Sequence, residues 1–173
     1  MKNIFLVGMP TSGKSSLGKA LANQLDYQFL DLDELIVERE GVSIAEIFRR
    51  HGEAYFRQSE RALLRSIVPN SRLVVATGGG TPCFFDNMSF IHANGLSLFM
   101  DVSPRELLRR LKDGRKNERP LFNVQADASI LLAGLEKKYE ERRIFYQQAH
   151  YSIQDDRIDL RKLLEVIKAE TLR

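Results

Sequence analysis

The chain has 173 residues, of which 43% are hydrophobic and 28% are charged, and its formal net charge is +3, which predicts one globular domain over residues 1–173. Basic and acidic side chains are mixed nearly everywhere, which argues against a nucleic-acid-binding stripe, and no apolar run approaches the roughly 18 residues of a membrane helix. A lone cysteine, Cys83, excludes an internal disulfide framework and, with no leader-like segment at the start, predicts a cytoplasmic protein, which we expect to be a monomer.

Short apolar segments alternate with segments of helical periodicity, and this alternation predicts a parallel α/β sheet. The expected strands span residues 3–7, 28–30, 73–76, 96–100 and, with a weaker pattern, 151–153. Ser43 and Ser103 each precede a glutamate by three residues, the capping box that begins a helix. Asp127 and Asp159 are suited to cap the last two helices.

The first expected strand runs directly into the residues GMPTSGKS at positions 8–15, which match the phosphate-binding pattern GxxxxGK(S/T). Gly8 and Gly13 permit backbone angles at which successive N–H groups turn inward around phosphate oxygens. Lys14 adds a positive charge, and the hydroxyl of Ser15 is a natural ligand for Mg²⁺. A helix over 15–25 directs its positive N-terminal end at the nucleotide. The segment therefore predicts nucleotide binding.

Two acidic residues, Asp31 and Asp33, follow the second expected strand. Residues two apart on an extended segment face the same side, so both carboxylates are expected at the C-terminal edge of the sheet, where α/β proteins bind ligands. One can hold Mg²⁺ through water while the other meets a substrate hydroxyl. The third expected strand ends in three glycines at 78–80, which allow a ligand to approach the backbone closely.

Two arginines are candidates for binding an anionic substrate. Arg57 precedes Glu60 by three residues, a spacing at which the two side chains pair on a helix; the alternative is an ordinary surface ion pair. Arg142 shares a helical stripe with Leu135 and Tyr139, and a charge on a buried stripe requires an anion beside it. That anion is either a ligand or a structural carboxylate.

The segment 112–125 is polar, contains glycine and proline, and is longer than an ordinary connection. It is either a functional lid or a connection without a role. Phe48 and Phe56 are spaced to wall a substrate ring, although apolar residues at such a spacing are more often part of a core.

Taken in order, these motifs resemble those of the shikimate kinase family. The resemblance covers residues 1–153 and rests on the P-loop, FLDLD at 29–33, EAYFRQSE at 53–60, ATGGG at 76–80, RPL at 119–121, and an arginine four residues before Tyr146. It implies a three-layer P-loop kinase fold, in which helices flank a parallel sheet of five strands, with substrate-binding helices over 34–66 and a mobile lid over 112–125. It also implies ATP and shikimate as substrates and Mg²⁺ as cofactor.

The resemblance also assigns roles to individual residues. Those expected to bind shikimate are Asp33, Arg57, Gly78, Gly79, Gly80 and Arg142. Those expected to bind ATP are Gly8, Thr11, Ser12, Gly13, Lys14, Ser15, Ser16, Arg119 and Arg110, the last by stacking on adenine. Ser15 and Asp31 are expected to hold Mg²⁺, and the expected catalytic residues are Lys14, Asp33 and Arg119.

The chain departs from the family pattern at Ile144 and Phe145, where the family commonly has Pro-Leu; this change is expected to tilt the end of the helix that carries Arg142. The alternative functions are a gluconate kinase, a nucleoside-monophosphate kinase, and a nucleotide-dependent switch or inactive binding module. A gluconate kinase also needs an arginine for its carboxylate substrate, yet the chain resembles that family only in the P-loop. A nucleoside-monophosphate kinase is not expected to carry both the acidic pair and the three glycines, and the base-specificity signature of a GTPase switch is absent.

Overall fold

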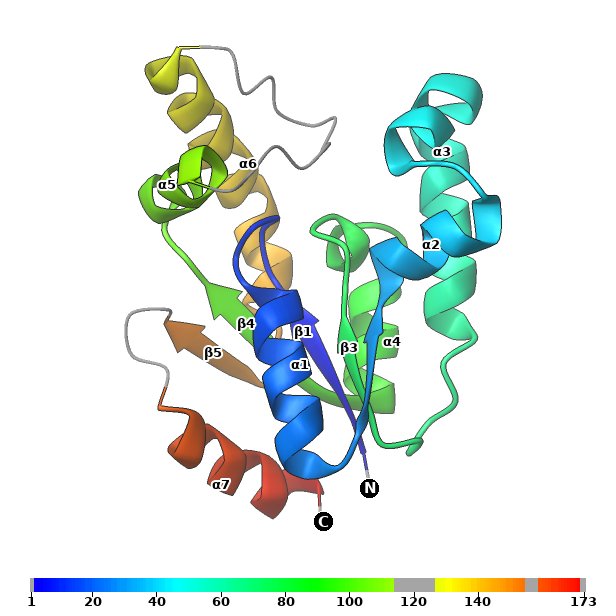
Figure 1. Cartoon of the computed structure of the whole chain (residues 1–173), viewed down its shortest axis with the longest axis vertical. Helices are drawn as coiled ribbons and strands as arrows, with labels where there is room; N and C mark the ends of the chain where they lie inside the picture. Colours follow the sequence, from blue (N-terminus) through cyan, green and yellow to red (C-terminus); the bar gives the residue numbers. More distant parts are fainter. Residues whose placement is uncertain (1, 114–126, 155–158, 172–173) are drawn as a thin grey trace.

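The computed structural model of the chain describes residues 2–113, 127–154 and 159–171 (Figure 1). The strands are β1 (Asn3–Val7), β2 (Gln28–Asp31), β3 (Leu73–Ala76), β4 (Gly95–Asp101) and β5 (Tyr151–Gln154). The helices are α1 (Lys14–Leu25), α2 (Leu32–Glu40), α3 (Ile44–Arg65), the short 3₁₀ helix η1 (Thr81–Cys83), α4 (Asn87–Asn94), α5 (Pro104–Asp113), α6 (Ala128–Tyr146) and α7 (Leu160–Thr171). None of the helices in these described ranges is both long enough and apolar enough to cross a membrane.

The described strands form one parallel sheet in the order β2-β3-β1-β4-β5. The central strand β1 aligns Leu6 with Ala76 of β3 and with Leu98 of β4. All of β1 is buried, as expected for the apolar central strand of a sheet covered on both faces. All the predicted strands are confirmed, including the weakly patterned one at 151–153. β2 and β5 each extend one residue further than predicted, and β4 extends by one residue at each end.

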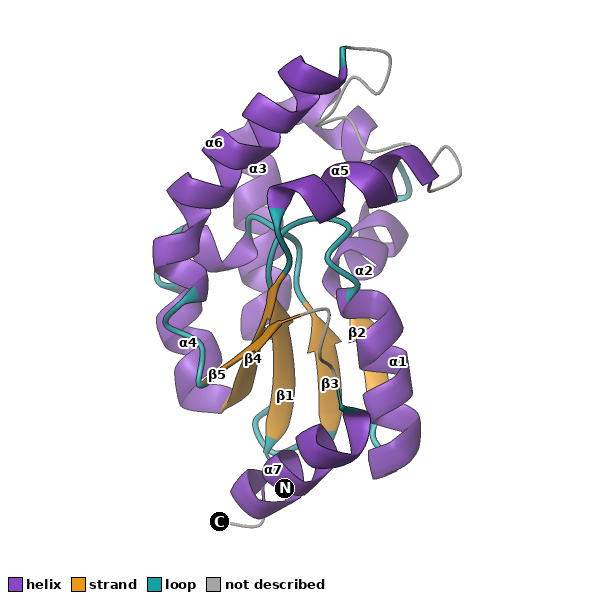
Figure 2. Ribbon diagram, turned by 90° about the vertical axis from the view of Figure 1, so that its left-hand side faces the viewer, coloured by secondary structure: helices purple, strands orange, loops and turns teal. Residues whose placement is uncertain are grey.

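Helices cover both faces of the sheet, which gives the three layers of the expected fold (Figure 2). On one face, α1 and α7 bury Leu21 and Ile167 in a cluster with Leu6. On the other face, α3, α4 and α6 contribute to a second cluster around Phe5 and Val7. Successive side chains of a strand point to opposite faces, so alternate residues of β1 anchor opposite layers. The apolar run before the P-loop thereby fixes that loop to the centre of the sheet.

The predicted helix starts are confirmed by their caps. Ser43 and Ser103 each accept a hydrogen bond from the N–H three residues further on, both at 3.3 Å. Asp127 and Asp159 accept one from the N–H two residues further on, at 2.7 and 3.1 Å. These bonds satisfy N–H groups that have no partner within the helix. Helix α1 begins at Lys14, one residue earlier than predicted.

Candidate active site

The P-loop leads from β1 into α1 at the C-terminal edge of the sheet (Figure 1). Its backbone requires glycine: Gly8 has φ 142° and Gly13 has φ 95°, and a Cβ on Gly8 would lie 2.8 Å from the carbonyl oxygen of Met100. Lys14 is 7% exposed and donates from Nζ to the carbonyl oxygens of Gly8 and Met9, at 2.9 and 2.7 Å. Its ammonium group therefore lies against the loop, where bound phosphates would meet it.

The first turn of α1 faces the same side as the P-loop. Ser15 and Ser16 lie in this turn and line a cavity there, together with Thr11 of the loop. Gly13 precedes the helix and offers no side-chain cap, so the first N–H groups are not covered by a capping side chain. Because the helix dipole also makes this end positive, the start of α1 suits a phosphate.

Asp31 ends β2 and caps α2, which changes the predicted arrangement of the acidic pair. Its carboxylate accepts a hydrogen bond from the N–H of Asp33 at 3.0 Å and another from the hydroxyl of Ser15 at 2.7 Å. Asp33 lies in the first turn of α2, so the prediction that both acids share one extended segment is wrong. Both nevertheless line the cavity, because α2 begins at this edge of the sheet. The oxygens of Ser15 and Asp31 are the ligand type that Mg²⁺ prefers.

Arg57 and Glu60 form a buried ion pair on α3, as their spacing predicts. Nη1 of Arg57 lies 3.0 Å from Oε2 of Glu60, and the two residues are 5% and 1% exposed. Glu53 contacts the same guanidinium at 3.1 Å, and the centre of the Phe84 ring lies 4.2 Å from its Cζ. The hydroxyl of Thr81 donates to Glu60 from the other side. Such burial excludes the ordinary surface ion pair and holds the guanidinium in one place.

Burial and neighbouring groups change the pKa of the Glu60 carboxyl group. Burial raises its pKa above the ordinary value, and the negative charge of Asp33 acts in the same direction. The charge of Arg57 and the hydrogen bonds from Arg57 and Thr81 act in the opposite direction. Asp33 therefore has a second acid, Glu60, on the other side of Gly78, and Arg57 balances the charge of that acid in part.

The three glycines after β3 lie against these groups, so no side chain fits there. A Cβ on Gly78 would lie 2.7 Å from Oδ1 of Asp33, and one on Gly80 would lie 2.5 Å from Nη1 of Arg57. A Cβ on Gly79 would lie 2.6 Å from the ring of the P-loop proline. The N–H groups of Gly79 and Gly80 donate to no other residue in the described ranges. Gly79 lines the cavity, so the triplet has the open backbone beside it that a close approach by a ligand requires.

Arg142 lies on α6, which is regular as far as Tyr146. Ile144 points to solvent and is 64% exposed, and the tilt of the helix end relative to the family, expected from Ile144 and Phe145, stays a prediction. Arg142 is half-buried and Arg143 is exposed, as the stripe predicts. Within the described part of the chain, no carboxylate forms an ion pair with Arg142, so the structural partner that the stripe left open is not found there.

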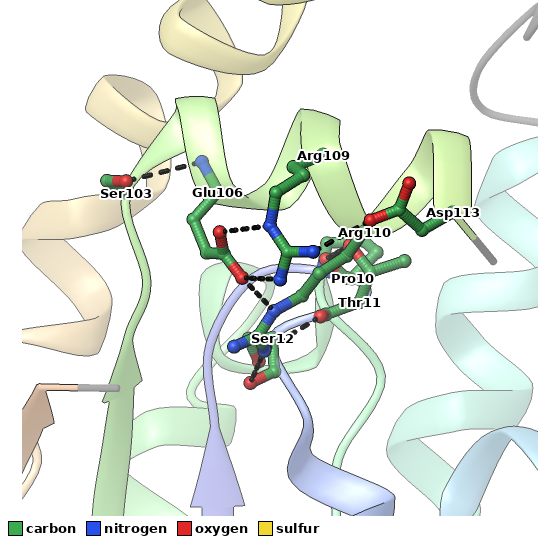
Figure 3. Close-up of polar contacts among 8 residues, drawn as sticks. All are labelled: Pro10, Thr11, Ser12, Ser103, Glu106, Arg109, Arg110 and Asp113. Atoms are coloured by element: carbon green, nitrogen blue, oxygen red, sulfur yellow. Dashed lines mark hydrogen bonds and ion pairs between the residues drawn. The ribbon is translucent and has the colours of Figure 1, made fainter. Parts of the chain in front are cut away.

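Helix α5 brings Arg110 to the P-loop (Figure 3). Its Nη1 donates to the carbonyl oxygen of Ser12 at 3.1 Å, and its Nε donates to Glu106 at 2.8 Å. The carboxylate of Glu106 also accepts from Arg109, whose second partner is Asp113 at 2.7 Å. Arg110 therefore contacts the phosphate-binding loop itself. Stacking on adenine, which the family resemblance implies, stays a prediction.

One cavity of about 300 Å³ joins the P-loop to the acidic residues. Its lining consists of Thr11, Gly13, Lys14, Ser15, Ser16, Asp31, Asp33, Thr77, Gly79 and Arg110. Arg119 falls outside the described residues, as does most of the expected lid, so its role stays a prediction from the sequence.

Some side chains around the cavity are not indicated by the sequence. Thr81 and Phe84 contact the Arg57–Glu60 pair, yet neither residue lies within one of the motifs recognised in the sequence. Conversely, Phe48 and Phe56 lie with ring centres 4.8 Å apart in an apolar cluster between α2 and α3, which favours the core interpretation. The signal that could have indicated Thr81 is its position directly after the glycine triplet.

Comparison with known proteins agrees with this geometry. The shikimate kinase family model matches residues 10–170. A shikimate kinase of Bacteroides fragilis is 40% identical over 165 residues, which is 95% of this chain and 91% of that protein. Two solved structures superimpose with a TM-score of 0.85. One is a shikimate kinase from Bacteroides thetaiotaomicron, at 37% identity and covering 98% of this chain and 95% of that one. The other is a shikimate kinase from Acinetobacter baumannii in complex with shikimate, at 31% identity and covering 99% of this chain and 93% of that one. The chain therefore belongs to the shikimate kinase family.

Proposed function

We propose that the chain transfers the γ-phosphate of ATP to the 3-hydroxyl of shikimate, which gives 3-phosphoshikimate and ADP for the biosynthesis of chorismate and the aromatic amino acids. The observation that carries the proposal is the meeting of Asp33, the Arg57–Glu60 pair and the glycine triplet at the edge of a P-loop cavity. An acid for a hydroxyl, a guanidinium for a carboxylate and open N–H donors together match a small hydroxylated acid.

The nucleotide half of the site is formed by the P-loop and the start of α1. The backbone of residues 8–16 and the ammonium group of Lys14 would bind the phosphates, with Arg110 beside the loop. Ser15 and Asp31, which already share a hydrogen bond, would hold Mg²⁺. When bound, Mg²⁺ supplies positive charge that neutralises the phosphate oxygens. Arg119, placed from the sequence alone, would reach the transferring phosphate.

The acceptor half of the site orients shikimate for in-line attack. Asp33 lies in the cavity lining, against Gly78, and would accept a hydrogen bond from the attacking hydroxyl. Because the transition state of phosphoryl transfer is loose, orientation of the nucleophile is the larger part of this role. Arg57 and Arg142 would bind the carboxylate from two sides, on α3 and α6. Arg142 suits this role because it has no carboxylate partner in the described part of the chain.

We further propose that the chain acts as a monomer of one domain in the cytoplasm, with residues 112–125 as a lid and without a nucleic-acid or membrane partner. These proposals rest on the sequence: a single reduced cysteine, interspersed charges and the polar composition of 112–125. A gluconate kinase remains the nearest alternative, since gluconate also carries a carboxylate and hydroxyl groups.

A comparison of acceptors tests the proposed function. ADP release, measured with a coupled assay on shikimate, gluconate and AMP, is expected to give a kcat/KM for shikimate at least about a hundredfold above the others, because a site built for particular polar groups rejects analogues that leave those groups unpaired. A preference for gluconate or AMP would contradict the proposal, and nucleotide binding without turnover of any acceptor would favour a binding module.

A further inference from the structure

Tyr146, the last residue of α6, joins three parts of the site that are far apart in the sequence. Its hydroxyl donates to the carbonyl oxygen of Gly79 and lies 3.7 Å from the sulfur of Met9 in the P-loop. The residue is fully buried, and its ring lies 5.2 Å from that of Phe99 on β4. The packed ring leaves the hydroxyl little freedom, and a buried hydroxyl without a partner is costly, so the bond to Gly79 has a defined geometry.

The bond to Gly79 fixes the orientation of a whole peptide unit. A trans peptide places its carbonyl oxygen and its N–H on opposite sides, and the described residues contain no cis peptide. With the carbonyl oxygen of Gly79 directed to Tyr146, the N–H of Gly80 must point away from Tyr146. That N–H donates to no other described residue, and Gly80 lies against the guanidinium of Arg57. Backbone bonds from Thr81 N–H to the Gly78 carbonyl, at 3.0 Å, and from Cys83 N–H to the Gly80 carbonyl, at 2.9 Å, hold the turn on either side. The bond from Tyr146 holds the central peptide itself, whose two glycines would otherwise allow it to flip.

The same hydroxyl lies beside Arg142. Arg142 precedes Tyr146 by four residues on a regular helix, so the two side chains share one face. The guanidinium acts on the phenol both by its charge and as a hydrogen-bond donor, which partly offsets the burial that raises the pKa of Tyr146. A phenol that donates to Gly79 keeps its lone pairs available to Arg142.

We propose that Tyr146 is a positioning residue that holds the Gly79–Gly80 peptide and Arg142 in register with each other, so that both meet the acceptor's carboxylate end. The inference rests on the proposed function, because it assumes that Arg142 binds that carboxylate. Tyr146 need not touch the substrate. It acts through the two groups that its hydroxyl connects.

Tyr146→Phe tests the inference, because it removes the hydroxyl and retains the packed ring. The KM for shikimate is expected to rise about tenfold, an effect of the size of one or two hydrogen bonds, with the KM for ATP changed less than about twofold. Tyr139→Phe is the matched control: Tyr139 lies on the same helix and loses a hydrogen bond of 2.6 Å to Asp101, away from the glycine triplet. It is expected to leave the KM for shikimate unchanged.

A double-mutant cycle separates positioning from general stability. In an Arg142→Ala background, Tyr146→Phe is expected to raise the KM for shikimate by a smaller factor than in the wild type, because part of its effect passes through Arg142. Fully additive effects, an unchanged KM for shikimate in Tyr146→Phe, or equal rises in both KM values would each overturn the inference. If Arg142→Ala alone leaves the KM for shikimate unchanged, the carboxylate assignment itself fails, and the inference fails with it.

Discussion

Asp31 and Asp33 are separated by one residue, yet their contacts differ in kind. Asp31 caps α2 and accepts a hydrogen bond from Ser15, whereas Asp33 lies in the first turn of α2, against Gly78. The first arrangement suits a group that acts through Mg²⁺, and the second suits a group that acts on the acceptor hydroxyl. Their proposed roles therefore follow from position rather than from residue type.

Substituting each acid by its amide should separate these roles. Asp33→Asn is expected to lower kcat with shikimate by about a hundredfold or more, since it removes the charge that orients the hydroxyl, while nucleotide affinity is retained. Asp31→Asn is expected to raise the Mg²⁺ concentration required for half-maximal rate. Steady-state kinetics with a Mg²⁺ titration measures both. Glu34→Gln, an exposed acid in the same first turn of α2, serves as the control. Loss of nucleotide affinity in Asp33→Asn with normal shikimate binding would show that the roles are reversed.

Whether the sequence predicts the contact of a single residue depends on how close its partner lies along the chain. The P-loop, the glycine triplet and the Arg57–Glu60 pair are each set by residues within one turn or one loop, so their patterns are readable. The hydroxyl of Tyr146 meets Gly79 across 67 residues, and that of Thr81 meets Glu60 across 21. Such contacts depend on how α6 and α3 pack on the sheet, which no local pattern encodes.

Among the elements, the strands were predictable because burial on both faces leaves an apolar signature. The junction between β2 and α2 was not, because Asp31 belongs to both elements and the helix begins without a connecting loop. Strand β5 has only a weak apolar pattern in the sequence, and its contacts with β4 explain why it nevertheless forms. It pairs with β4 through Met100 and Ile153, and its first residue follows His150, which also contacts β4.

His150 links the start of β5 to β4 in a way that depends on pH. Its Nδ1 accepts a hydrogen bond from the N–H of Ser97 at 3.1 Å, so this nitrogen carries no proton. Its ring stacks on that of His92, with centres 3.9 Å apart. Burial, followed by the charges of His92 and Lys2, lowers the pKa of His150 below its ordinary value of 6.5, against an opposing effect of Glu170. The fold therefore favours the neutral imidazole.

The unfolded chain binds this proton more readily than the folded chain, so the free energy of unfolding should fall as the pH is lowered from about 7 to about 5. His150→Gln removes the titrating group and is expected to reduce that slope. Urea unfolding of both proteins across this range, with the values near pH 8 as reference, measures the difference. The stabilities of wild type and His150→Gln should converge on acidification. A constant gap between them at every pH would contradict the linkage.

At the scale of the whole molecule, the site lies where the sheet order reverses. β1 has β3 on one side and β4 on the other, and the connections from these strands carry the glycine triplet and Arg110 to either side of the P-loop. The residues proposed to bind the nucleotide phosphates come from the loop after β1 and from α5, whereas those proposed to bind the acceptor come from α2, α3 and α6. No one of these elements forms the site alone, so both ligands should bind only the folded chain.

Ligand binding should therefore stabilise the chain in two separable parts. At about 100 times its Kd, a ligand contributes about 2.7 kcal/mol to the free energy of unfolding, which for a domain of this size corresponds to a rise in Tm of about 5 to 10 °C. A non-hydrolysable ATP analogue with Mg²⁺, and shikimate separately, are each expected to give such a shift in the wild type. Calorimetry or thermal fluorescence measures both.

The matched variants remove one shift at a time. Arg142→Ala is expected to lose most of the shikimate shift and keep the nucleotide shift. Arg142 is half-buried and makes no ion pair with a described residue, so its removal leaves no described carboxylate without its partner. Lys14→Ala is expected to show the opposite pattern, since its ammonium group lies against the P-loop carbonyls where phosphates would bind. If each variant lost both shifts equally, the two halves would not be independent, and the division of the site between the P-loop side and the α3–α6 side would be wrong.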